Sequence, residues 1–220
     1  MTTYHVDPHA DPLSFDLGGG VFCTKQSLGD MDNNGYLLEP TEGPAVWIDA
    51  AAEPEVIAKV LAGRPLAAVI TTHRHFDHIG ATAAVLAATG AVGFCGEPDR
   101  QSIIDDTATE QVGVWTGDTI NVGTAGRLEV IGIVGHTPGS ITLAWSPADG
   151  PTHLFTGDTL FPGGFGKTWS PDDFASLAAD ITTHVFDRFG DDTVVHPGHG
   201  DATTLGAERP HLEEWRERGW

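Results

Sequence analysis

Short apolar runs alternate with turns rich in glycine, proline and aspartate along most of the chain, and this pattern predicts many short β-strands. Runs of about four to eight apolar residues between such turns are typical of strands with at least one buried face. We expect strands at 21–28, 35–38, 45–48, 66–70, 91–95, 112–115, 119–122, 128–134, 141–145, 153–156 and 193–195.

Four other segments have the composition and the end signals of helices, which we expect at 54–61, 79–88, 171–189 and 210–218. Ser170 is a suitable N-cap for the third of them, and Gly90 ends the alanine-rich second one. Strands come first in each half, with helices interspersed. The pattern predicts an α/β protein, an αββα sandwich of two mixed sheets with helices on the outer faces.

A length of 220 residues suits one domain over 1–220, with residues 1–14 as an extended N-terminal arm whose His5 and His9 lie at the surface. We find no apolar stretch long enough to span a bilayer and no secretory signal. Cys23 and Cys95 lie apart in apolar stretches, so we expect two buried thiols rather than a disulfide. These features predict a cytoplasmic protein.

The formal net charge is −20, from 31 acidic and 11 basic residues. Such a chain repels phosphate backbones and anionic membrane surfaces. We therefore expect neither nucleic acid nor a membrane as a partner, while the oligomeric state is left open.

The segment His73-Arg74-His75-Phe76-Asp77-His78 contains three imidazoles and one carboxylate in six positions. These are ligands for a divalent metal of the zinc type. Three later residues, His136, Asp158 and His199, each lie in a glycine-rich loop just after a predicted strand. Loops at strand ends bring distant ligands together on a rigid frame.

The order HxHxDH, then His, then Asp, then His resembles the metallo-β-lactamase fold superfamily, over about residues 20–205. The resemblance implies the αββα sandwich with metals at one edge. It also implies one metal ion held by His73, His75 and His136, a second held by Asp77, His78 and His199, and Asp158 as the bridge between them.

Seven protein ligands are too many for one tetrahedral zinc ion but suit two divalent ions that share a carboxylate. Zinc is the expected metal, with iron or manganese as alternatives. A water shared by two cations ionises near neutral pH, and Asp77 is positioned to orient the resulting hydroxide. Asp49, at a strand end, is either a partner of a ligand histidine or a simple turn residue.

Two segments, 155–169 and 197–208, are similar to the corresponding stretches of glyoxalase II, the hydroxyacylglutathione hydrolases. This resemblance implies that Lys167 and Trp169 contact the thiol carrier of a thioester. Their alternative roles are a surface lysine and a core aromatic. This sequence lacks the basic C-terminal helical region of the full-length enzymes. Near its end it has only Arg209, Arg216 and Arg218, so the alternatives to glutathione are another small thiol or an ester.

We therefore predict a binuclear metal-dependent hydrolase that cleaves a thioester of a small thiol through a bridging hydroxide. A mononuclear iron persulfide dioxygenase and a lactonase are the alternatives. A zinc β-lactamase, a nuclease, a flavodiiron protein and a non-catalytic metal-binding module fit the pattern less well. We expect the remaining histidines to be surface or supporting residues, namely His153, His184, His196 and His211.

Overall fold

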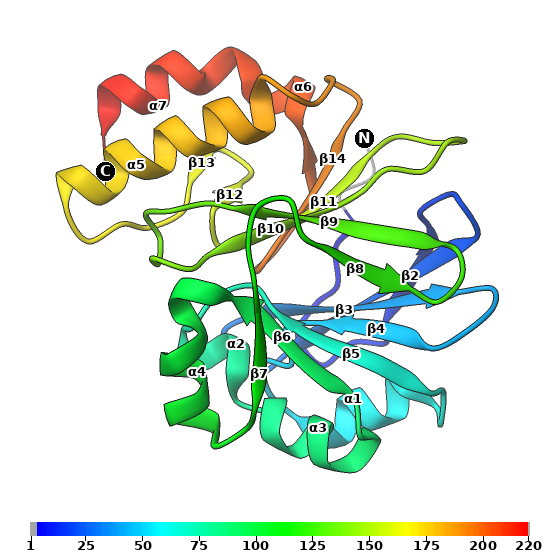
Figure 1. Ribbon diagram of the computed structural model, residues 1–220. Coiled ribbons are helices and arrows are strands. Elements are labelled where there is room, and N and C mark those ends of the chain that lie inside the picture. The colour runs from blue at the N-terminus through cyan, green and yellow to red at the C-terminus, as the bar shows by residue number, and fades with distance from the viewer. Residues whose placement is uncertain (1–3, 220) are drawn as a thin grey trace.

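Two β-sheets pack face to face across the middle of the molecule, and helices cover both outer faces (Figure 1). This computed structural model describes residues 4–219. The four layers run helix, sheet, sheet, helix, which confirms the predicted αββα sandwich. Within residues 4–219, no helix has both the length and the apolar composition needed to cross a membrane.

The first sheet has seven strands, and its neighbours follow the order of the chain. Strands β1 to β4 pair antiparallel and β4 to β7 pair parallel. The strands are β1 (Leu13–Asp16), β2 (Val21–Leu28), β3 (Asn33–Pro40), β4 (Ala45–Ile48), β5 (Leu66–Thr71), β6 (Val92–Gly96) and β7 (Gln111–Val114).

The second sheet has six strands in the order β15-β14-β11-β10-β9-β8, in which β11 and β14 are parallel and the other pairs antiparallel. Its strands are β8 (Thr119–Val122), β9 (Gly126–Gly132), β10 (Ile141–Trp145), β11 (His153–Gly157), β14 (Val194–Pro197) and β15 (Thr203–Thr204). A small hairpin, β12 (Leu160–Phe161) with β13 (Gly164–Phe165), lies beside it.

Helices α1 and α3 cover the first sheet, and α5 and α7 cover the second (Figure 1). The full set is α1 (Pro54–Leu61), α2 (Phe76–Ile79), α3 (Thr82–Thr89), η1 (Glu97–Asp99), α4 (Arg100–Thr107), α5 (Pro171–Ile181), the π-helical turn η2 (Thr182–Phe186), α6 (Leu205–Glu208), η3 (Arg209–His211) and α7 (Leu212–Arg218).

Three apolar clusters fill the three spaces between these four layers. Strand β10 shows why some strands have no charged or exposed residue. Leu143 packs between the two sheets, whereas its neighbour Ala144 packs against the outer helices. Successive side chains of a strand point to opposite faces, so a strand covered on both sides has no solvent face.

The predicted arm is shorter than expected, because β1 begins at Leu13 and pairs with β2. Residues 1–3 of that arm lie outside the described residues. The predicted helix 171–189 is also wrong in its second half, where the chain becomes the π-helical turn η2. Thr182 donates its hydroxyl to the carbonyl of Ala178, a bond that competes with regular helix geometry.

The predicted helix 79–88 begins later than expected: the single turn α2 ends at Ile79, a turn follows at Gly80 and Ala81, and helix α3 begins at Thr82. Gly80 packs so closely on Ala51 that a Cβ atom there would lie 2.6 Å from the Ala51 carbonyl oxygen. The single turn of α2 carries Asp77 and His78. Its separation from α3 therefore sets the direction in which these two side chains point.

Candidate metal centre

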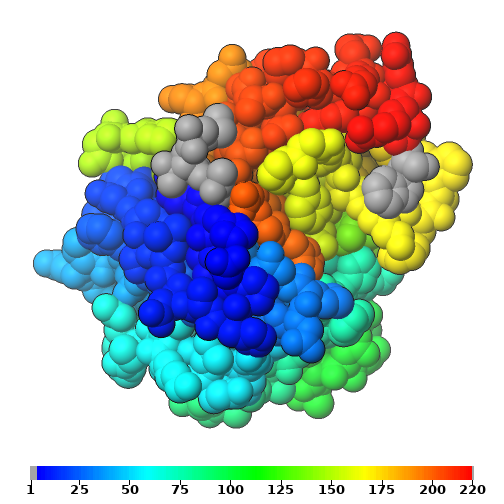
Figure 2. Space-filling model, turned by 180° about the vertical axis from the view of Figure 1, so that it is seen from behind, coloured from blue at the N-terminus to red at the C-terminus, as the bar shows by residue number. Residues whose placement is uncertain are grey.

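All seven predicted metal ligands meet at one edge of the sandwich, although they come from four separate segments of the chain. His73 follows β5, and the turn α2 carries Asp77 and His78. The loop between β9 and β10 supplies His136. Asp158 follows β11, and His199 follows β14. Figure 2 shows the segment after β14 (orange) between the N-terminal residues (blue) and residues 160–175 (yellow).

Three imidazoles form the first group of ligands. The Nε2 atom of His73 lies 3.0 Å from Nδ1 of His75 and 3.2 Å from Nε2 of His136. Zinc–nitrogen bonds of about 2.0–2.1 Å in a tetrahedron place the ligand atoms about 3.3 Å apart. The spacing of these nitrogens is therefore that of ligands around one ion.

The second group consists of Asp77, His78 and His199. The Nε2 atoms of the two histidines lie 3.3 Å apart. Oδ2 of Asp77 lies 3.4 Å from the His199 nitrogen and 3.6 Å from the His78 nitrogen. This group has the same spacing as the first and presents one carboxylate oxygen.

Asp158 reaches both groups. Its Oδ2 lies 3.3 Å from Nε2 of His199 and 3.7 Å from Nε2 of His136. Its Oδ1 is buried and makes no hydrogen bond within the described residues. Such an atom is costly unless a cation binds it. A Cβ at Gly198 would lie 2.1 Å from this oxygen, so glycine there permits the close approach.

Hydrogen bonds on the outer ring nitrogens orient the histidines. Nδ1 of His78 donates to Asp49 at 2.8 Å, that of His136 donates to the Lys167 carbonyl at 2.7 Å, and that of His199 donates to the Met31 carbonyl at 2.8 Å. In a neutral ring the Nε2 atom then carries only a lone pair. Lone pairs that face one another at 3.3 Å favour a shared cation.

The ionisation of the cluster also suits a metal. Burial would raise the pKa of Asp158, but contacts with His199 and His78 outweigh it and hold the pKa well below its usual range. Burial lowers the pKa of His73, His75 and His136. Three neutral imidazoles beside an ionised carboxylate form a donor set ready for a divalent ion.

Two histidines of the second group bind protons strongly when no metal competes. Burial lowers the pKa of His199, but hydrogen bonds with Asp158 and Asp77 outweigh it and raise the pKa to about 10. The pKa of His78 also rises, because its contacts with Asp49 and Asp158 outweigh burial. A cation that binds here must displace these protons.

Two supporting residues were not found from the sequence. Asn33 donates from Nδ2 to Oδ2 of Asp77 at 3.0 Å. Asp99 is fully buried and accepts from the Thr137 hydroxyl at 2.6 Å and from the backbone of Arg74 at 3.1 Å, so it joins the two loops that carry the first group. An isolated Asn or Asp near the end of a strand has no spacing signal that would distinguish it.

The other histidines divide into two kinds. His153 and His196 were expected at the surface or as supporting residues. Both are buried, and they hydrogen-bond to each other at 3.0 Å, apart from the ligand set. His184 is partly exposed and His211 is exposed. Cys23 and Cys95 are buried free thiols, as predicted.

A cavity of about 660 Å³ lies beside the loop whose Lys167 carbonyl accepts from His136. It is lined by Lys167, Thr168, Trp169, Ser170, Pro171, Phe174, Arg218 and Gly219. The Trp169 ring centroid lies 6.2 Å from that of His75, and Lys167 Nζ lies 4.5 Å from the centre of the Trp169 ring. Arg218, which the sequence analysis did not assign to the site, enters from the end of α7.

Comparison with solved structures agrees with this architecture. The crystal structure of the BLEG-1 B3 metallo-β-lactamase superposes with a TM-score of 0.76 at 25% identity, covering 88% of this chain and 99% of that one. TTHA1623, solved in a di-iron-bound form, gives a TM-score of 0.68 at 28% identity, covering 84% of this chain and 96% of that one.

Sequence relatives include a hydroxyacylglutathione hydrolase of Polaromonas sp., 37% identical over 169 residues that cover 76% of this chain and 62% of that protein. The hydroxyacylglutathione hydrolase GloC of Haemophilus influenzae is 27% identical over 198 residues, covering 83% and 87%. Against the first five curated relatives, the chain spans 51–62% of their length.

A family model also matches most of the chain. The model of the metallo-β-lactamase superfamily aligns with residues 28–204, a range that contains all seven predicted ligands and the β-strands that precede them. With the sandwich, the order of the ligands and this alignment in agreement, the chain belongs to the metallo-β-lactamase superfamily.

Proposed function

We propose that the protein is a hydrolase that binds two divalent cations, with zinc as the first candidate, and cleaves thioesters of a low-molecular-weight thiol. One observation carries the proposal: Asp158 lies between the two ligand groups, and its Oδ2 lies 3.7 Å from His136 of the first group and 3.3 Å from His199 of the second. A single-metal centre would have no use for Asp77, His78 and His199 at ligand spacing.

The side chains have separate tasks in this proposal. Bound ions would supply a Lewis acid and a nucleophilic hydroxide at neutral pH. Asp77 remains ionised, because its hydrogen bond with His199 and the contact with His78 outweigh burial and lower its pKa. Its carboxylate can accept a hydrogen bond from the nucleophile and orient it. Asn33 donates to the same carboxylate oxygen that faces His78 and His199 and so helps to hold it in place.

The cavity beside the ligands suggests an anionic substrate. It contains two cations, Lys167 and Arg218, and none of its described lining residues is acidic. In a chain of net charge −20 that combination is unusual. A thioester whose thiol part bears carboxylates, such as the hydroxyacylglutathione in the names of the relatives, fits this charge and the exposed Trp169 ring.

Metal content and substrate preference test the proposal together. The purified protein should hold close to two metal ions per chain by elemental analysis. It should release thiol from a hydroxyacyl thioester of glutathione faster than from a neutral thioester of N-acetylcysteamine. A protein that carries two ions and cleaves neither thioester would contradict the proposal.

The alternatives give different results in the same experiment. Close to one iron per chain, with oxygen consumed in the presence of a glutathione persulfide, would indicate a dioxygenase. Two ions with turnover of lactones alone would indicate a lactonase. The intact second ligand group is the observation that favours the two-metal hydrolase over the mononuclear enzyme.

A further inference from the structure

A lysine is buried beneath the loop that carries His199. Lys25 lies on β2 and is 1% exposed. It shares the inner face of the sheet with Cys23, and it pairs across the strands with Tyr36. An ammonium group in this position is expensive, since charged groups are rarely buried without partners.

The ammonium group donates a hydrogen bond to a backbone carbonyl. Nζ of Lys25 donates to the Gly200 oxygen at 2.6 Å. Asn34 donates to the same oxygen at 3.0 Å and to the Pro197 oxygen at 2.9 Å. The Tyr36 hydroxyl also donates to Pro197, at 2.6 Å. Strands β2 and β3 therefore hold the carbonyls on both sides of His199.

The turn of the same hairpin contacts the ligand itself. The Met31 carbonyl accepts from Nδ1 of His199, and Asn33 forms an isolated β-bridge with His199. Asn33 also bonds to Asp77. Its Nδ2 atom also lies 3.5 Å from Nε2 of His78, so the hairpin contacts all three residues of the second group.

The first group has different supports. His73 is oriented by the Thr72 hydroxyl at 3.1 Å, and His136 by the Lys167 carbonyl. Asp99 joins their two loops. Among the described hydrogen bonds, none links His73, His75 or His136 to residues of β2 or β3.

We propose that Lys25 is a positioning residue: it sets the affinity of the second ligand group for its metal ion and leaves the affinity of the first group unchanged. The inference rests on the proposed two-metal centre. Loss of the ammonium group would leave the Gly200 carbonyl with only its longer hydrogen bond from Asn34 and let His199 turn away from Asp77 and His78. Removing the outer support of a metal ligand typically weakens metal binding by about 10–100-fold.

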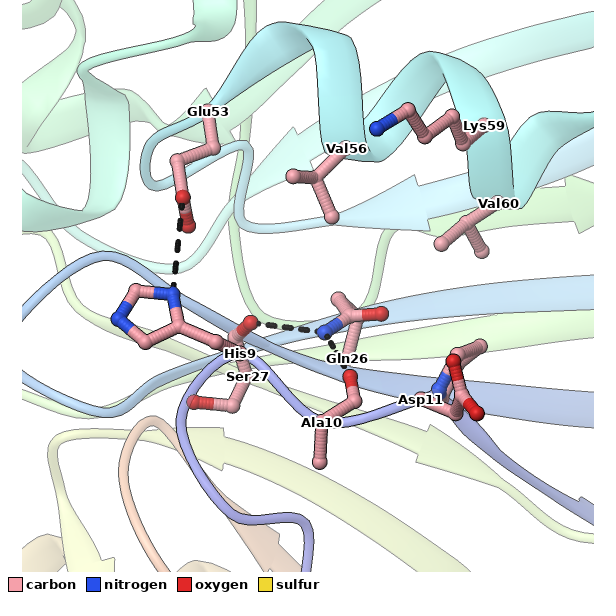
Figure 3. Close-up of a pocket in the computed structure, with 10 residues that line it drawn as sticks. His9, Ala10, Asp11, Gln26, Ser27, Glu53, Val56, Lys59 and Val60 are labelled. Carbon is pink, nitrogen blue, oxygen red and sulfur yellow. Dashed lines mark hydrogen bonds and ion pairs between the residues drawn. The ribbon is translucent and has the colours of Figure 1, made fainter.

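The next residue offers a matched control. Gln26 is as deeply buried as Lys25, but its side chain points to the opposite face of the sheet. There it donates to the carbonyl of Ala10 in a cavity between the arm and α1 (Figure 3). The same substitution at position 26 disturbs the strand without touching the loop of His199.

The experiment compares metal-free wild type, Lys25→Met and Gln26→Met by titration with zinc against a chromophoric chelator. Wild type and Gln26→Met should bind two ions with the same two affinities. Lys25→Met should keep the tight site and lose about 10–100-fold at the other. Unchanged binding, or equal weakening at both sites, would overturn the inference.

A second variant covers the case in which Lys25→Met does not fold. Asn34→Ala removes two other donors to the same carbonyls and should also weaken one site selectively. Wild-type protein that binds one ion would instead contradict the two-metal proposal itself. The two failures are therefore distinguishable without an activity assay.

Discussion

Asp158 is the residue on which the pairing of the two ligand groups depends. In Asp158→Ala we expect one bound ion per chain in place of two and a loss of several orders of magnitude in kcat, because the shared carboxylate is gone. Elemental analysis and thioester turnover measure both effects. Asp118→Ala, a change in a surface turn, serves as the control. Full activity in Asp158→Ala would exclude the mechanism.

The main-chain carbonyl and the side chain of Lys167 have different roles. Its carbonyl orients His136, and its ammonium group faces the cavity. Lys167→Ala should therefore keep the wild-type metal content and raise KM for an anionic thioester several-fold with little change in kcat. The neutral thioester should be unaffected, as should a Lys59→Ala variant. An unchanged KM would remove the side chain from the substrate site.

At the scale of elements, regular segments were predictable and their irregular ends were not. The limits of α1, β4, β8 and β10 match the predicted ranges, since each is an apolar or alternating run with turn residues at its ends. Strands β12, β13 and β15 have two residues each, too few for any period. Helix α4 was missed because its exposed side is polar and its buried stripe is narrow, with Ile103 fully buried.

The candidate site also has a part that the sequence predicts, the ligands, and a part that it does not, the supporting residues. Its ligands are predictable because metal chemistry restricts them to His and Asp at recognisable spacing. The supports, such as Lys25 and Asp99, depend on contacts between segments far apart in the chain. The sequence around Lys25 has no local feature that would identify Gly200 as its hydrogen-bond partner.

Helix α5 begins with a side-chain cap. Ser170 accepts from the backbone amide of Asp173 at 3.1 Å. Ser170→Ala should lower the free energy of unfolding by about 1 kcal/mol, and the melting temperature by about 2–4 °C. Ser146→Ala, at an exposed serine, should change neither measurably. Equal melting temperatures in all three proteins would show that the cap is not needed.

For the whole molecule, the buried pair His153 and His196 predicts acid sensitivity. Burial lowers the pKa of His153 to about 4, against a small opposing effect of Asp16, and lowers that of His196 well below its usual range. The unfolded chain protonates both near pH 6.5. Their contribution to stability is therefore complete above about pH 6.5 and is lost as the pH falls toward 4.

Urea unfolding at pH 7.5, 5.5 and 4.5 measures this loss. His196→Phe keeps an aromatic ring among Tyr36, Phe155 and Phe15 and removes one titrating group. Its stability should fall less steeply between pH 7.5 and 4.5 than that of the wild type. The same slope in both proteins would show that the acid effect arises elsewhere, for example in the metal ligands.

The separation between the wall of the cavity and the metal ligands also affects how such a protein can diverge. Residues 167–171 and the end of α7 line the cavity. The hydrogen bond that joins this wall to His136 is accepted by the main-chain carbonyl of Lys167. Any side chain at position 167 leaves that carbonyl in place. In the proposed enzyme, mutations of these side chains would therefore change the substrate preference one step at a time, while the two ligand groups keep their positions.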